Sequence, residues 1–89
     1  MNETELKAAI RTADFEDAIQ ILSDYISTHP EEDEPLILRG MKYWGAGKRS
    51  LALNDYLAAI AINPQSRANQ ALRATQDILD YRNKDLYNP

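Results

Sequence analysis

Residues 33–66 read DEPLILRGMKYWGAGKRSLALNDYLAAIAINPQS, and this stretch decides the fold of the chain. It holds two segments with apolar residues at helical spacing, which are separated by Gly-Ala-Gly at 45–47. Pro35 falls in the first turn of the first segment, where its missing N–H costs nothing. A glycine just beyond that segment suits a left-handed C-terminal cap. The stretch therefore predicts a helical hairpin, with helices from Asp33 or Glu34 to about Ala46 and from about Lys48 to Ile62.

The chain also repeats itself with a period of 34 residues. When the sequence is shifted by that amount, four positions match: Ala18 with Ala52, Leu22 with Tyr56, Ile26 with Ile60, and Pro30 with Pro64. The first three lie four residues apart along a helix, so they share one slowly drifting face. Self-similarity at a fixed period of this length is typical of stacked helical repeats.

The remaining elements follow from the same periodicity and from capping residues. We expect helices over 3–12, over 15–28 with Asp14 as N-cap, and from about Arg67 to Tyr81 with Ser66 as N-cap. Pro30 and the acidic cluster at 31–34 separate the second helix from the third. Residues 82–89 have no helical periodicity, and we interpret them as a tail.

Residues 33–66 resemble a complete tetratricopeptide repeat. They read Leu36-x-x-Arg39-Gly40-x-x-Tyr43, then Ala52-x-x-x-Tyr56, then Ala59 and Pro64, which is similar to the pattern of that family. Small residues at Gly40 and Ala52 let two antiparallel helices approach closely, and Pro64 ends the second helix. Arg39 departs from the pattern, which usually has leucine there. We expect its aliphatic stem to lie along the core while the guanidinium reaches water.

The resemblance extends more weakly to both sides of this repeat. Residues 3–32 resemble a degenerate repeat, and residues 67–81 resemble a lone first helix that caps the array. The resemblance implies an all-α fold: a right-handed superhelix of two helical hairpins plus a C-terminal capping helix. It also implies a single domain over 1–81, followed by the tail at 82–89.

Composition and charge exclude several classes of function. There is no cysteine, which excludes disulfides and thiolate metal sites. Residues 1–35 carry ten acids and two bases, whereas 36–89 carry four acids and eight bases. This dipolar layout argues against nonspecific nucleic-acid binding, which needs a strong basic excess. No apolar run approaches the roughly 18–20 residues of a membrane span, and the acidic start is unlike a secretory signal. We expect a soluble, cytoplasmic protein with neither nucleic-acid nor membrane partners.

Catalysis has little support in the sequence. The single histidine, His29, stands in a turn where we expect it to be exposed and incidental. There is no glycine-rich phosphate loop, nucleophile motif or histidine cluster. The acids at 31–34 lack the alternating ligands and central glycine of a calcium loop. We therefore predict a protein that is not an enzyme and has no cofactor and no metal.

The resemblance instead implies a groove that holds a protein or peptide partner, lined by the first helix of each pair. The residues that match those positions are Lys7, Ile10, Arg11, Ile37, Met41, Trp44, Ala71, Thr75 and Ile78. Residues 37, 41 and 44 form a single helical stripe, which either faces the groove or packs on neighbouring helices. Trp and Met are common anchors at partner surfaces. The expected ligand is an apolar or weakly acidic segment.

The alternative function is self-association, in which copies stack into homodimers or larger assemblies. Stable stacking usually needs at least three repeats, and this chain has about two and a half. The acidic N-terminal part and the basic C-terminal part would also attract each other head to tail.

Overall fold

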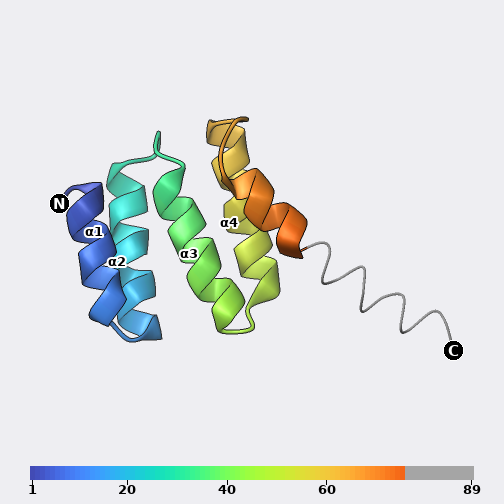
Figure 1. Ribbon diagram of the computed structural model, residues 1–89. Helices are drawn as coiled ribbons and strands as arrows, with labels where there is room; N and C mark the ends of the chain where they lie inside the picture. The colour runs from blue at the N-terminus through green and yellow to red at the C-terminus, as the bar shows by residue number, and fades with distance from the viewer. Residues whose placement is uncertain (76–89) are drawn as a thin grey trace, which may run out of the picture.

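The computed structural model describes residues 1–75, and within them the chain is entirely α-helical. The helices are α1 (Glu3–Thr12), α2 (Phe15–Thr28), α3 (Glu34–Gly45) and α4 (Arg49–Ile62), and a further helical segment spans 68–75. Each of α1 to α4 packs against the next one along the chain, so that they stand in a row (Figure 1). The all-α prediction is confirmed. The expected end of the last helix at Tyr81 and the tail at 82–89 lie outside the described residues.

The helix starts are set by side-chain caps in the first hairpin. Asp14 accepts a hydrogen bond from the backbone N–H of Asp17 at 2.9 Å, as predicted for the N-cap of α2. Asn2 and Glu5 form a capping box at the start of α1. Ser66 Oγ accepts from the N–H of Ala68 at 3.1 Å, which confirms the cap expected before the last helical segment.

The turn between α3 and α4 is a Schellman motif centred on Gly47. This glycine has φ of 78°, the left-handed conformation predicted for it. The N–H of Lys48 donates to the carbonyl of Tyr43 at 2.9 Å, and the N–H of Gly47 donates to the carbonyl of Trp44 at 3.1 Å. These are the two hydrogen bonds that define the motif, and they satisfy carbonyls at the end of α3.

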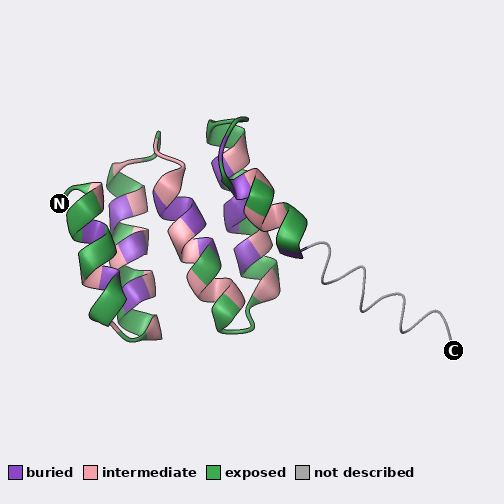
Figure 2. Cartoon of the chain, in the orientation of Figure 1, coloured by how far each residue is buried: buried purple, intermediate pink, exposed green. Residues whose placement is uncertain are grey.

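Two hydrophobic clusters, one in each hairpin, form the core (Figure 2). The cluster of the first hairpin consists of Leu6, Ile10, Ala18, Leu22 and Tyr25. The cluster of the second hairpin consists of Leu36, Ile37, Ala52, Tyr56, Ala59 and Ala68. Helices α2 and α4 both have 14 residues, and their bounds differ by the period found in the sequence. Ala18 and Ala52, which that period pairs, are both completely buried.

Gly40 marks the closest approach of α3 to α4. A Cβ atom added at this position would lie 2.6 Å from the ring of Tyr56. Tyr56 is itself buried, so its ring fills the space that the glycine leaves. The predicted role of a small residue at this helix crossing is confirmed.

Arg39 corrects one expectation from the sequence. Its guanidinium does not reach freely into water: it donates to both carboxylate oxygens of Asp55, at 2.8 and 2.7 Å, and to Ser23 Oγ at 3.1 Å. The exposed fraction is 22% for the Arg39 side chain and 7% for that of Asp55. A carboxylate this deeply buried needs a cation beside it. Arg39, at a position where the repeat pattern usually has leucine, supplies that cation. The hydrogen bond to Asp55 raises the pKa of Arg39 above its ordinary value.

Candidate partner-binding groove

A pocket of about 430 Å³ opens between α3, α4 and the helical segment at 68–75. Its lining residues are Met41, Trp44, Gly45, Tyr56, Arg67, Gln70, Ala71, Ala74 and Thr75. Met41 and Trp44 come from α3, and residues 70–75 form the facing wall. Small side chains on the facing wall leave room beside the two large ones. The result is an open, mainly apolar hollow of the kind that receives a side chain of a ligand.

Met41 and Trp44 differ in how they contribute to this pocket. Met41 is 50% exposed, so half of this large apolar side chain is open to solvent beside the pocket. Trp44 is partly buried and packs against the core cluster of the second hairpin. The guanidinium of Arg49 lies 5.1 Å from the centre of its ring, in cation–π geometry. Trp44 is therefore held in place before any ligand arrives, whereas Met41 remains adaptable.

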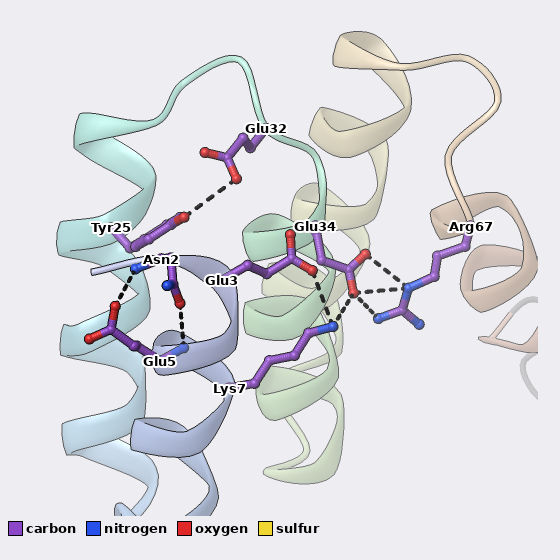
Figure 3. A network of polar contacts seen from close by, with 8 residues as sticks. All are labelled: Asn2, Glu3, Glu5, Lys7, Tyr25, Glu32, Glu34 and Arg67. Carbon is purple, nitrogen blue, oxygen red and sulfur yellow. Dashed lines mark hydrogen bonds and ion pairs between the residues drawn. The ribbon is translucent and has the colours of Figure 1, made fainter.

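Glu34 does not line the pocket but holds Arg67, the charged residue of the lining, through a network of polar contacts (Figure 3). One carboxylate oxygen of Glu34 accepts from Arg67 Nε at 2.9 Å, and the other lies 3.7 Å from Lys7 Nζ. Lys7 Nζ in turn lies 3.2 Å from Glu3. These contacts tie α1, α3 and the last helical segment together at one end. The hydrogen bond to Glu34 raises the pKa of Arg67, so its charge is fixed and locally compensated.

The structure brings four of the nine predicted groove residues together at the pocket, namely Met41, Trp44, Ala71 and Thr75. The Oγ1 of Thr75 donates to the carbonyl of Leu72 at 2.7 Å, so this hydroxyl is already satisfied within its own helix. Lys7 does not line the pocket. Its Nζ contacts Glu34, which in turn accepts a hydrogen bond from the lining residue Arg67.

The other predicted groove residues lie elsewhere. Ile10 is 5% exposed and Ile37 is completely buried, so both belong to the core clusters. The stripe predicted at 37, 41 and 44 is thus divided, with its first residue in the core and the other two at the pocket. Arg11 is exposed in the last turn of α1 and is not among the pocket-lining residues. Ile78 lies outside the described residues.

Sequence reasoning missed several lining residues: Gly45, Tyr56, Arg67, Gln70 and Ala74. Residues 67, 70 and 74 are separated from one another by three and four positions, so the helical periodicity of that segment could have found them. Tyr56 belongs to the repeat pattern but was not among the predicted groove residues. Its ring lies against Gly40 and also lines the pocket.

His29 occupies a second, smaller hollow and is not the exposed residue that the sequence suggested. It is half-buried, and its ring stacks on Tyr25 with centroids 3.9 Å apart. Its Nδ1 lies 3.0 Å from the carbonyl oxygen of Tyr25 and 2.9 Å from Thr28 Oγ1. Burial, assisted by the Glu32 carboxylate, raises the pKa of Tyr25. Packing and hydrogen bonds within α2 therefore account for this histidine.

Among residues 1–75, no group of three or more His, Asp or Glu side chains is arranged to hold a metal ion. None of the helices described there has the length and apolar character to cross a membrane. No family model matches the chain, and neither a curated protein nor a solved structure shows significant similarity to it.

Proposed function

We propose that this chain is a tetratricopeptide-like module that binds a segment of another protein and carries out no catalysis. The repeat period, the equal lengths of α2 and α4, and the close approach at Gly40 support the assignment to this class. The proposal takes the helices to form a right-handed superhelix, in which α1, α3 and the helical segment at 68–75 line the concave side.

The observation that carries this proposal is the pocket at Met41 and Trp44. A half-exposed methionine beside a fixed tryptophan, opposite a wall of small residues, provides an anchor site for one apolar side chain. Packing of the core does not explain why the Met41 side chain is half-exposed beside Trp44. Tight partner interfaces are commonly centred on such aromatic anchors, with the surrounding contacts serving to exclude water.

The charges around the pocket favour a weakly acidic ligand over a strongly acidic one. Arg49 does not line the pocket, but its guanidinium lies over the ring of Trp44 and offers positive charge beside that residue. The charge of Arg67, at the other wall, is compensated by Glu34. The proposed ligand is therefore a segment with an apolar anchor residue and one nearby acid, which would meet Arg49.

The experiment uses Trp44 as its own reporter, because it is the single tryptophan of the chain. Peptides selected from a random display library are titrated into the protein while the emission of Trp44 is followed. We expect saturable shifts in emission, and weakening of at least tenfold for Met41→Ala, which removes a lining side chain.

Leu57→Ala is the matched control, since it truncates a similarly exposed apolar residue outside the pocket. This variant should bind the selected peptides as the unaltered chain does. A library that yields no binders, or binders that lose equal affinity in both variants, contradicts the proposal.

Self-association is the second candidate function, and a different surface favours it. The outer side of α4 exposes several large apolar side chains that the pocket does not use.

A further inference from the structure

The outer face of α4 is apolar, exposed and without charge. We define this face as the seven exposed residues of the helix that point away from the core: Ser50, Leu51, Asn54, Leu57, Ala58, Ala61 and Ile62. The exposed fraction is 53% for Leu57 and 45% for Leu51. Figure 2 shows stretches of exposed surface along α4 between its buried positions. A row of apolar residues that no described part of the chain covers indicates a contact surface.

The equivalent helix of the first hairpin shows that the fold does not require this face to be apolar. The residues of α2 that lie 34 positions earlier are all polar: Glu16, Asp17, Gln20, Ser23, Asp24, Ser27 and Thr28. Both helices have the same length and bury the matching alanines on their inner sides. At every one of these places except 50 and 54, α4 replaces a polar residue with an apolar one. Of the seven α2 residues, Ser23 is half-buried and accepts a hydrogen bond from Arg39 of α3, and the other six are exposed to water. The outer face of α4 is therefore mainly apolar, whereas that of α2 is polar and largely solvated.

The ends of α4 indicate what covers it. Its first turn contains no acid and is preceded by Lys48, so Lys48 and Arg49 stand at the positive end of the helix dipole. Its last turn contains no base to meet the negative end. A second α4 running in the opposite direction compensates for the unfavourable charge at both ends of the helix dipole. It brings its own two bases to the carbonyl end of the first helix, and it places the bases of the two copies roughly 20 Å apart.

The shapes along the face also fit an antiparallel copy. From start to end, the face has four layers: residues 50 and 51, residue 54, residues 57 and 58, and residues 61 and 62. A two-fold axis at its middle sets the first layer against the fourth and the second against the third. Leu51 then meets Ala61, and Leu57 meets Asn54, so a large side chain faces a smaller one. The acids of the first hairpin stay far from the axis, because α1 and α2 pack on the other side of α3.

We infer that two copies of this chain pair through the outer faces of α4, antiparallel about a two-fold axis. An uncharged face can meet its own copy without repulsion even though the chain carries a net charge of −4. The inference rests on the second candidate function, self-association, and is independent of partner binding, because none of the seven face residues lines the groove.

Sedimentation equilibrium of the full chain at about 100 μM tests the inference. We expect the unaltered protein to be dimeric, and Leu57→Glu to weaken the dimer at least tenfold, because it places two carboxylates near the axis. Met41→Glu is the control: it puts the same charge on an exposed apolar position in the groove and leaves the dimer intact. A monomeric unaltered protein, or a dimer that Leu57→Glu does not weaken, overturns the inference.

Disulfide trapping supplies a second readout that does not depend on weakening the fold. The chain has no cysteine, so a single introduced thiol can pair only with that of another copy. Under mild oxidation Asn54→Cys, beside the two-fold axis, should form a covalent dimer, whereas Gln20→Cys, at the equivalent place on α2, should stay monomeric. Equal cross-linking of the two variants, with the helical content of both intact by circular dichroism, contradicts pairing through α4.

Discussion

The first hairpin and the second hairpin are built on one helix spacing, yet they present different surfaces. The helices of the first begin with side-chain caps, at Asn2 and Asp14, and the outer face of α2 is polar. Neither helix of the second has a side-chain cap, and that hairpin provides the pocket and the apolar outer face of α4. We propose that this difference reflects a division of roles, in which the outer face of the first hairpin stays in water and the second hairpin binds partners.

The largest expected effect comes from the buried ion pair, which only the second hairpin has. Asp55 stands where the first hairpin has Ile21, and Asp55→Ala leaves the Arg39 guanidinium without its main partner. We expect a loss of about 3 kcal/mol in the free energy of unfolding, measured by guanidinium denaturation.

The double variant Arg39→Leu with Asp55→Ile sharpens this comparison, because it makes position 55 match the first hairpin. Replacing a buried pair with apolar residues is often neutral, so we expect stability within about 1 kcal/mol of the unaltered chain. If the double variant were as unstable as Asp55→Ala, the ion pair would not be the cause.

A smaller effect is expected where α3 crosses α4. In Gly40→Ala the new methyl group would press on the buried Tyr56 ring. Overpacking of this kind costs about 1–3 kcal/mol, against which alanine gains up to about 1 kcal/mol in helix propensity. We expect a net loss of about 1–2 kcal/mol by thermal and chemical unfolding. Gly45→Ala is the control, because a Cβ there meets nothing within 4 Å, and it should not destabilise the chain.

The next effect is the loss of a helix cap, which should cost about 1 kcal/mol of unfolding free energy in the first hairpin and less in the second. Asp14→Ala removes the hydrogen bond to the N–H of Asp17 and should lower the free energy of unfolding by about that amount. Asp33 occupies the matching place before α3 but makes no side-chain cap bond. We therefore expect Asp33→Ala to cost no more than about 0.5 kcal/mol in the same measurement. Equal losses in the two variants would contradict the assignment of side-chain capping to the first hairpin.

The smallest effect is a pH dependence that the hairpins share. Burial raises the pKa of both Tyr25 and Tyr56 above the ordinary value of 10.0, with further contributions from Glu32 and Asp55 respectively. The native state then holds these protons more tightly than the unfolded state, so stability falls as pH rises through and above that value. Denaturation at neutral and at alkaline pH should show this fall. It should be shallower in Tyr25→Phe, and an unchanged slope would contradict the stated cause.

Helix positions and caps could be predicted because they depend on residues close together in sequence. The role of Gly40 was predicted from the tetratricopeptide resemblance, because its contact, Tyr56, lies on the next helix. The ion pair could not be predicted, since Arg39, Asp55 and Ser23 come from three helices whose contacts appear only after folding. The groove was predicted in part for a similar reason. Periodicity placed Ile37, Met41 and Trp44 on one stripe, but the neighbouring helices decide where that stripe passes from core to surface.

The division of roles between the hairpins is tested most directly by mapping a bound ligand on isotope-labelled protein. Backbone amide shifts are recorded by NMR while a display-selected peptide is added. The account predicts changes concentrated at Met41, Trp44 and 70–75, with the amides of α1 and α2 nearly unmoved. Changes centred instead on α2 or on the hollow beside His29 would contradict it.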